Sequence, residues 1–559
     1  MIFSRLPIEL HLMIIGYLGP IDIFHLQLTC TALNGLIEDS SEHVWRHCLR
    51  RHIIRNDLFA PSYAHLTTAA ELRHAATAPL RFASAYREAV ASNSPISKTT
   101  KVLNFPANDM KDAKEDIMEM YLIPGGRFLL TFKQTSMSLW DIRSSPNVEL
   151  CVSTEIGAFN SMLYLDAVSD NTIRIIYLVD VPAATQELVS HYRFLELRWN
   201  AEHTFTVHHL GSLALVHNLE ISMQSLQSLS IAGSRIIILL GDTTVVWDYQ
   251  RNSYTGWRLM GVSSPSELLS NDRYVLYLTN EGIHGVFFLD FNPIAGGYVK
   301  METLFAHLES PVFSVYFKGG PYDLIGNTLL PNKVWVSDSD IPIDGETYLN
   351  IYIRESSFTL KVDRESEVLP SQLRPDGRWE QELPGGYDID HFADDELYGT
   401  LHVHRYTFSY CPSTPATSAL TQVSTTKHTM PPMRNSHYYS AECYAARYFS
   451  APFYQKCDGP ETAVTLWSDG GDEVFFGEGA KPVFLSFVDD RAEGSNKQAT
   501  IVPFINPRQF VTQSWVVESE VCPASAKGVV MWEDDAHDIP VQDGALGVWL
   551  ELYEIGRIA

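Results

Sequence analysis

This 559-residue chain contains two histidines whose type and spacing could do chemistry. His402 and His404 lie two residues apart in the run YGTLHVHRYTFSY, which is typical of a strand. Alternate residues of a strand face the same side of the sheet, so the two imidazoles could bind a metal ion together with further ligands. No cysteine or carboxylate is placed to complete such a site, and we interpret the two residues as paired surface histidines.

Other signatures of catalysis or ion binding are incomplete. Asp338, Asp340 and Asp344 lie in the acidic stretch DSDIPIDGE, but the spacing to a bidentate glutamate does not fit a calcium loop. The run GEGAK at 477–481 lacks the spacing and the Ser or Thr of a phosphate-binding loop. The hydrolase motifs G-x-S-x-G and H-E-x-x-H are absent. The sequence therefore predicts no catalytic residue, no metal site and no cofactor.

Four tryptophans at the ends of apolar runs could form an aromatic cage for a ligand. They are Trp140, Trp247, Trp467 and Trp532. A large aromatic side chain at the end of a buried strand more often packs against neighbouring sheets. We interpret all four as packing residues.

Charge divides the chain into two unequal parts. Residues 1–101 hold 10 Lys and Arg against 8 Asp and Glu, so their net charge is +2. Since the whole chain has a net charge of −26, the remaining residues carry −28. An acidic body repels phosphate backbones, which disfavours nucleic acid as a partner. No uncharged apolar run is long enough to span a membrane, and no membrane partner is expected. The 7 cysteines are scattered without C-x-x-C spacing, which favours a cytoplasmic or nuclear protein with reduced thiols.

The elements that would position a binding site begin with a short helical segment, residues 6–52. Leu10, Ile14 and Leu18 recur every four residues, and Met13 and Tyr17 widen the stripe, which places all five on one face of a helix. The segment is too short to cover so many large apolar side chains by itself. We therefore expect it to need a partner surface.

Helix boundaries in this segment follow from its prolines and polar residues. Pro7 suits the first turn of the first helix, and Gly19-Pro20 is expected to end it. Asp22 is placed to cap a second helix. The apolar residues of that second helix are expected to be Ile23, Leu26, Cys30 and Leu33. A third segment is expected to end at Trp45.

The order and spacing of these residues resemble the F-box family. The residues that carry the resemblance are Leu6, Pro7, Glu9, Leu10, Ile14, Leu18, Asp22, Leu26, Leu28, Cys30 and Trp45. The residues that would bind an adaptor if it holds are Leu6, Pro7, Leu10, Ile14, Leu18, Ile23, Leu26, Leu28 and Trp45. The departures are Leu33, where a Trp is common, and Ile23-Phe24, where Leu-Leu is usual. The run LQLTCTALNGL also resembles a leucine-rich repeat unit, but no second copy follows at the period of such repeats.

Residues 53–101 continue with helical sequence rich in Ala, Leu, Arg and Glu. Pro79 indicates two helices, and Thr68 followed by Glu71 is a capping signal for the first of them. Similar helices follow the F-box in many F-box proteins, notably the fungal set whose next segment carries GGR and LWD motifs. Here they are expected to hold the F-box at a fixed angle, with a linker at 92–100.

Short β-branched and aromatic runs replace helical periodicity after residue 102. Three stretches share one pattern of turn, Arg, apolar strand, polar turn and second apolar strand: 125–142, 233–249 and 271–291. Weaker copies follow to residue 555. LWDI and VWDY look like WD-repeat strand ends, although the G-H dipeptide of that family is absent. We predict a degenerate WD-like β-propeller of about seven blades, with a solenoid or paired β-sandwiches as alternatives.

Three stretches are expected to be loop insertions because they are rich in polar, Ser, Thr or Pro residues: 365–386, 411–434 and 489–499. The fold class is therefore an α+β multidomain chain. It would hold an F-box domain at 1–52, linker helices at 53–101 and a substrate-recognition propeller at 102–559, which should fold without the F-box.

The resemblance implies a non-catalytic subunit of an SCF-type cullin–RING ubiquitin ligase. Its F-box would bind the Skp adaptor, and the propeller would bind an unknown protein substrate and raise its effective concentration beside the charged enzyme. One alternative is a scaffold that binds the adaptor without directing ubiquitination. The other is a propeller enzyme with an incidental pair of N-terminal helices.

Overall fold

The structure is a computed structural model, and it describes a large part of the chain. The described residues are 6–55, 58–92, 96, 98–105, 117–143, 147–166, 171–182, 187–218, 226–240, 243–259, 267–270, 274–279, 282–287, 294–295, 298–300, 306–308, 313–316, 334–338, 347–361, 396–410, 419–429, 433–434, 453–455, 462–468, 483–489, 497–505, 514–522, 525–534 and 548–556.

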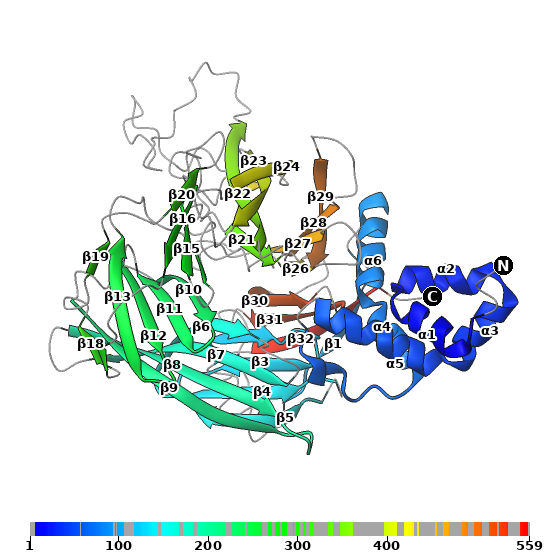
Figure 1. The fold of residues 1–559 in the computed structure, drawn as a ribbon, viewed down its shortest axis with the longest axis horizontal. Coiled ribbons are helices and arrows are strands. Elements are labelled where there is room, and N and C mark those ends of the chain that lie inside the picture. The colour runs from blue at the N-terminus through cyan, green and yellow to red at the C-terminus, as the bar shows by residue number, and fades with distance from the viewer. Residues whose placement is uncertain are drawn as a thin grey trace.

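A helical head precedes a body of β-sheets, as the sequence predicts (Figure 1). The head, residues 6–55, contains α1 (Ile8–Gly16), α2 (Pro20–Thr29), α3 (Thr31–Asp39) and α4 (Ser41–Arg55). Figure 1 shows α1, α2 and α3 at one end of the molecule, on the far side of α4 and α5 from the sheets.

Two expected helix boundaries in the head are wrong. Asp22 does not cap α2, because Gly19 occupies the N-cap and Pro20 begins the helix, leaving Asp22 in the first turn. The second helix also stops at Thr29 instead of continuing through Cys30. Cys30 is extended, with φ −161° and ψ 156°, and is the N-cap residue of α3.

Two further helices connect the head to the sheets, after the short 3₁₀ turn η2 (Ala60–Tyr63). They are α5 (Ala69–Ala76) and α6 (Ala78–Ser92), so Pro79 lies at the start of a second helix as predicted. The predicted capping signal is confirmed: the Glu71 backbone N–H donates to Thr68 Oγ1 at 3.2 Å, and the Thr68 N–H donates to the Glu71 carboxylate at 2.9 Å.

The sheets of residues 119–316 share one plan, in which neighbouring strands are mostly antiparallel and consecutive in the sequence, apart from short parallel pairings on the edges of two sheets. The first holds β2 (Glu119–Leu122), β3 (Phe128–Phe132), β4 (Ser136–Asp141) and β5 (Glu149–Glu155). The second holds β6 (Phe159–Asp166), β7 (Thr172–Pro182), β8 (Glu187–Trp199) and β9 (Phe205–Asn218), with β18 (Tyr298–Lys300) on its edge.

The third sheet holds β10 (Leu226–Ala232), β11 (Arg235–Leu240), β12 (Thr243–Asp248) and β13 (Ser253–Leu259), with β17 (Ile294–Ala295) and β19 (Ala306–Leu308) on β13. The fourth holds β14 (Glu267–Ser270), β15 (Tyr274–Leu278), β16 (Gly282–Phe287) and β20 (Phe313–Tyr316). The three repeated hairpins predicted from the sequence are β3–β4, β11–β12 and β15–β16.

A fifth four-stranded sheet joins two distant parts of the chain. Strand β1 (Lys98–Val102) pairs with β32 (Val548–Ile555), which continues to β31 (Lys527–Asp534) and β30 (Ser514–Cys522). The stretch 92–100, expected to be a linker, therefore includes the start of a strand. An early strand that completes the last sheet is how propellers close their ring of blades and remove exposed edges.

Residues 334–505 pair in one nine-stranded sheet. Its strands are β21 (Val334–Asp338), β22 (Thr347–Lys361), β23 (Glu396–Tyr410), β24 (Ala419–Thr429), β25 (Met433–Arg434), β26 (Phe453–Gln455), β27 (Thr462–Ser468), β28 (Val483–Asp489) and β29 (Lys497–Ile505). The loop predicted at 411–434 is wrong over β24, whose threonines suit a strand despite their polarity. The predicted loop 365–386 lies outside the described residues.

Adjacent sheets share apolar cores. One core combines Phe128 and Leu130 of the first sheet with Ile173 and Tyr177 of the second. Corresponding cores join the second sheet to the third and the third to the fourth. Small antiparallel sheets packed face to face in sequence order are the arrangement of a β-propeller. The fold class is therefore a helical head followed by a WD-like propeller body, while the number of seven blades stays a prediction.

Candidate functional site

The head exposes a group of large apolar side chains on α1 and α2. We call this group the apolar surface, and its members are Ile8, Leu10, Met13, Ile14, Tyr17, Ile21 and Leu28. Positions 10, 13, 14 and 17 follow the spacing of one helix face, and positions 21 and 28 are two turns apart on the same face of α2. Tyr17 is 75% exposed and Leu28 is 83% exposed. A patch of this kind on a folded protein marks an interaction site.

A buried layer beneath this surface fixes the helices that present it. Ile15 of α1, Ile23 of α2 and Ile37 of α3 have no exposed area, and Trp45 of α4 is 1% exposed. The Arg51 guanidinium of α4 donates hydrogen bonds to the carbonyls of Gly16 and Leu18, at 3.1 and 3.2 Å. These carbonyls end α1 and would otherwise have no partner within the helix. The apolar surface is therefore held by a packed and hydrogen-bonded support.

An aromatic contact ties the same support to α5. The rings of Phe24 and Trp45 lie 5.4 Å apart, and the Arg73 guanidinium lies 4.8 Å from the Phe24 centroid and 5.7 Å from that of Trp45. A guanidinium over aromatic faces is attracted by their quadrupoles. α5 therefore contributes to the position of α2 and α4.

The predicted adaptor-binding residues fall into three groups. Pro7, Leu10, Ile14 and Leu28 are exposed, and Leu6, Leu18 and Leu26 are half-buried. Ile23 and Trp45 are fully buried and pack the head from within, so in this arrangement they present no surface to a partner. The burial follows from geometry, because Ile23 is on the opposite side of α2 from Ile21 and Leu28.

Ile8 and Ile21 are exposed members of the apolar surface that the family pattern did not single out. The spacing of seven residues between Ile21 and Leu28 was the available signal. It places both on one face of α2 once the helix is known to begin at Pro20.

Histidines lie beside the support rather than on the apolar surface. The rings of His43 and His47, one turn apart on α4, are 4.6 Å between centroids. Burial lowers the pKa of His47, with smaller contributions from His43 and Arg50. The folded head therefore favours the neutral form of His47.

The groups considered for chemistry are only partly within the described residues. Trp140 and Trp247 are buried in two different cores, as the packing interpretation requires. Within the described ranges no group of three or more His, Cys, Asp or Glu could hold a metal ion. His402 and His404 lie in β23, and Asp338 ends β21, while the side chains of Trp467 and Trp532 lie outside the described part. None of the helices described is long and apolar enough to cross a membrane.

Comparisons with known proteins agree with the head. The model of the F-box-like family matches residues 3–51. No curated protein matches the chain. Among solved structures, the chain is similar to the WD40 domain of SCAP from fission yeast, at a TM-score of 0.33 and 8% identity, covering 79% of this chain and 82% of that one.

Two further solved structures have comparable likeness. The Pan2 WD40 domain of Neurospora crassa has a TM-score of 0.26 and 10% identity, with 77% of this chain and 87% of that one covered. The N-terminal domain of Nup159 has a TM-score of 0.27 and 7% identity, covering 78% and 90%. At such low scores the fold of the body rests on its strand order instead. The chain therefore contains an F-box-like domain in residues 3–51, followed by linking helices and a body of antiparallel, propeller-type sheets.

Proposed function

We propose that the chain is the substrate-recognition subunit of an SCF-type cullin–RING ubiquitin ligase. The F-box-like head binds a Skp-type adaptor through the apolar surface, and the β body binds a target protein. The observation that carries the proposal is the exposure of the apolar surface on a rigid support, inside the segment that the F-box-like model matches. Domains of this type are typically interaction modules, and the proposed role in the cytoplasm or nucleus is not catalytic.

The exposed fraction of Leu10 and Ile14 limits the free energy that these side chains can contribute to the proposed adaptor contact. Leu10 is 41% exposed and Ile14 is 40% exposed, so less than half of each side chain remains to be covered by a partner. Fully burying an aliphatic side chain is worth roughly 1.5–3 kcal/mol. Two partly exposed side chains therefore contribute on the order of 1.2–2.4 kcal/mol together, or roughly ten- to a hundredfold in affinity.

Adaptor binding is tested with purified proteins and matched variants. Leu10→Ala with Ile14→Ala should weaken binding to a Skp-type adaptor roughly ten- to a hundredfold in calorimetry. The control is Ile54→Ala with Met118→Ala, because these residues are 61% and 47% exposed but lie outside the apolar surface. Adaptor binding that is absent in the unmodified protein, or equally weakened in the control, contradicts the proposal.

The alternatives are separated by two further measurements. A scaffold without a role in ubiquitination would bind the adaptor, but no protein would gain a longer half-life when the chain is removed. A propeller enzyme would bind neither adaptor nor cullin. The target itself would be sought among proteins that accumulate when residues 6–55 are deleted.

A further inference from the structure

A short segment between α4 and α5 is one of the places where the helical region meets the body; α6 is another, since Arg81 donates to the Gly556 carbonyl at 3.1 Å. We call residues 58–66 the docking segment. The Phe59 backbone N–H donates to the Pro124 carbonyl at 3.1 Å, in the turn between β2 and β3. The Phe59 ring is fully buried in the core shared by the first two sheets, beside Phe128 and Phe205. A residue of the helical region thus forms part of the core of the β body.

Two glycines in the β2–β3 turn make room for this contact. Gly125 has φ +108°, and a Cβ at that position would lie 2.6 Å from the Ser62 Cβ. Gly126 has φ +68°, and its Cβ would collide with Ser525 Oγ of the fifth sheet. Both conformations favour glycine, and both positions lack space for any larger residue. The turn is therefore shaped to fit the docking segment on one side and the fifth sheet on the other.

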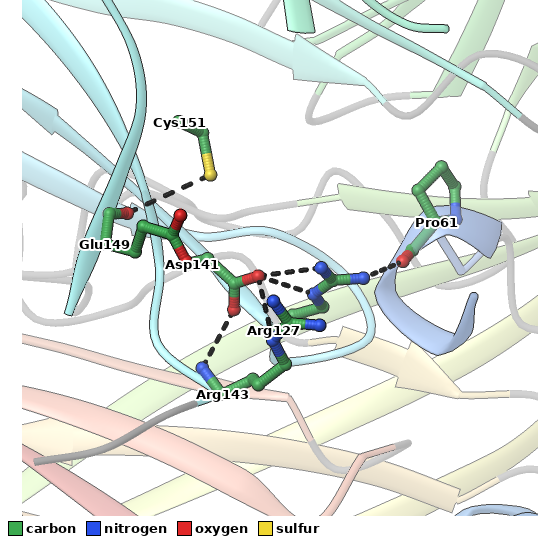
Figure 2. A network of polar contacts seen from close by, with 6 residues as sticks. All are labelled: Pro61, Arg127, Asp141, Arg143, Glu149 and Cys151. Carbon is green, nitrogen blue, oxygen red and sulfur yellow. Dashed lines mark hydrogen bonds and ion pairs between the residues drawn. The ribbon is translucent and has the colours of Figure 1, made fainter. Parts of the chain in front are cut away.

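The next residue, Arg127, joins the docking segment to β4 (Figure 2). Its Nε and Nη2 donate to Asp141 Oδ2 at 2.9 and 2.7 Å, and its Nη1 donates to the Pro61 carbonyl at 2.8 Å. Arg127 is 5% exposed and Asp141 is 3% exposed. Asp141 is held in turn by the Arg143 backbone N–H, which donates to Oδ1 at 2.9 Å.

The planar guanidinium is what allows both contacts to be made together. Its nitrogens donate in fixed directions, so two can pair with a carboxylate while a third reaches another acceptor. The same plane lies 4.6 Å from the Phe128 centroid and 5.4 Å from that of Trp199. An ammonium group at this position could keep the charge but not this set of directions.

The third sheet provides an internal comparison. In the β11–β12 hairpin Arg235 lies directly opposite Asp248. In the β3–β4 hairpin the residue opposite Asp141 is Phe128, and Arg127 comes one residue before it. Both hairpins thus place an arginine near the aspartate of a Trp-Asp pair. Arg235 is half-buried and Asp248 keeps a 13% exposed side chain, whereas Arg127 and Asp141 lie beneath the docking segment. In the first hairpin the arginine also reaches the docking segment, through the Pro61 carbonyl.

We propose that Gly125, Gly126, Arg127 and Asp141 form a latch that holds the helical head in one orientation on the β body. The pairing of Arg127 with Asp141 sets the guanidinium, and the guanidinium holds the carbonyl of Pro61. The latch fixes the direction in which the apolar surface faces. A role of the latch in presenting a captured protein rests on the proposed function. The existence of the latch does not.

The latch is tested by hydrogen exchange on the full chain. Arg127→Lys keeps the charge and removes the fork, so the backbone amides of Phe59 and Ser62 should exchange at least roughly tenfold faster than in the unmodified protein. Amides of β11 and β12 should be unchanged. The matched control, Arg235→Lys, should leave exchange in the docking segment at its original rate.

Two results would overturn the latch. One is unchanged exchange in the docking segment of Arg127→Lys. The other is an equal increase in the docking segment and in β11–β12, which would show a general loss of stability. Adaptor affinity, measured on the same variants, should stay within a factor of two because the apolar surface is intact. An unmodified protein that binds no adaptor would contradict the proposed function and leave the exchange result standing.

Discussion

Replacing Phe59 by alanine tests whether the docking segment stabilises the β body. The ring has no exposed area, and its centroid lies 5.9 Å from that of Phe128 and 6.1 Å from that of Phe205. Truncating a fully buried Phe to Ala costs about 3–5 kcal/mol, through lost transfer free energy and the cavity left behind. Domains are stable by about 5–15 kcal/mol, so the loss would be a large fraction of the total.

The position of Phe59 sets an upper limit to this loss. If the docking segment detaches before the body unfolds, the cost cannot exceed the free energy of keeping the segment docked. A loss near 3–5 kcal/mol would show that docking is at least as strong as the packing it supports. A smaller loss, together with rapid exchange of the Phe59 amide, would give the docking free energy directly.

The assay is urea denaturation followed by far-ultraviolet circular dichroism and tryptophan fluorescence. Phe59→Leu fills much of the same space and should lose less than half as much stability as Phe59→Ala. Ile54→Ala is the surface control, since Ile54 is 61% exposed, and should change the free energy of unfolding by less than about 0.5 kcal/mol. A Phe59→Ala midpoint equal to that of the unmodified protein would refute the packing argument.

Two further predictions concern the boundary of the body and its response to acid. A fragment beginning at residue 58 should be monomeric and resist limited proteolysis, whereas one beginning at residue 103 should aggregate in size-exclusion chromatography. The shorter fragment lacks β1, which pairs with β32 over five residues, and exposes that edge and the Phe59 site. Burial, followed by the charges of Arg127 and Arg143, lowers the pKa of His65 from 6.5 to about 4, so the folded state favours neutral imidazole. The stability this provides is complete above pH 6.5 and is lost as the pH falls towards 4. In acid titrations at fixed urea, His65→Gln should therefore lose less stability than the unmodified protein across that window. Equal losses would contradict the reasoning.

Local signals in the sequence predicted much of the fold. The spacing of Leu10 and Ile14 predicted an apolar face, and Thr68 with Glu71 predicted a helix start that the hydrogen bonds confirm. The three hairpins were predicted because a turn between two apolar runs is a local feature. Each of these needs only residues close to one another in the chain.

Features that depend on distant residues were missed. Ile23 and Trp45 belong to the family pattern, but the pattern does not distinguish residues that contact a partner from those that pack the head. Burial of Phe59 depends on Phe128 and Phe205, which lie in distant strands, and β1 pairs with β32 at the far end of the chain. Strand β24 was mistaken for a loop because its Ser and Thr residues are common in both, and pairing with β23 decides between them.

The pairing of β1 with β32 also has a consequence for how the chain is made. About 450 residues separate the two strands, and a ribosome adding roughly 5–20 residues per second needs on the order of 20–90 seconds to travel between them. During that time Lys98–Val102 has no antiparallel partner from β32, while the exposed side chains of α1 and α2 have already emerged. The nascent chain therefore presents an unpaired strand segment and an apolar helix face together, which are the features that chaperones and early-binding partners recognise. An adaptor that bound the head at this stage would cover one of the two before the last strand arrived.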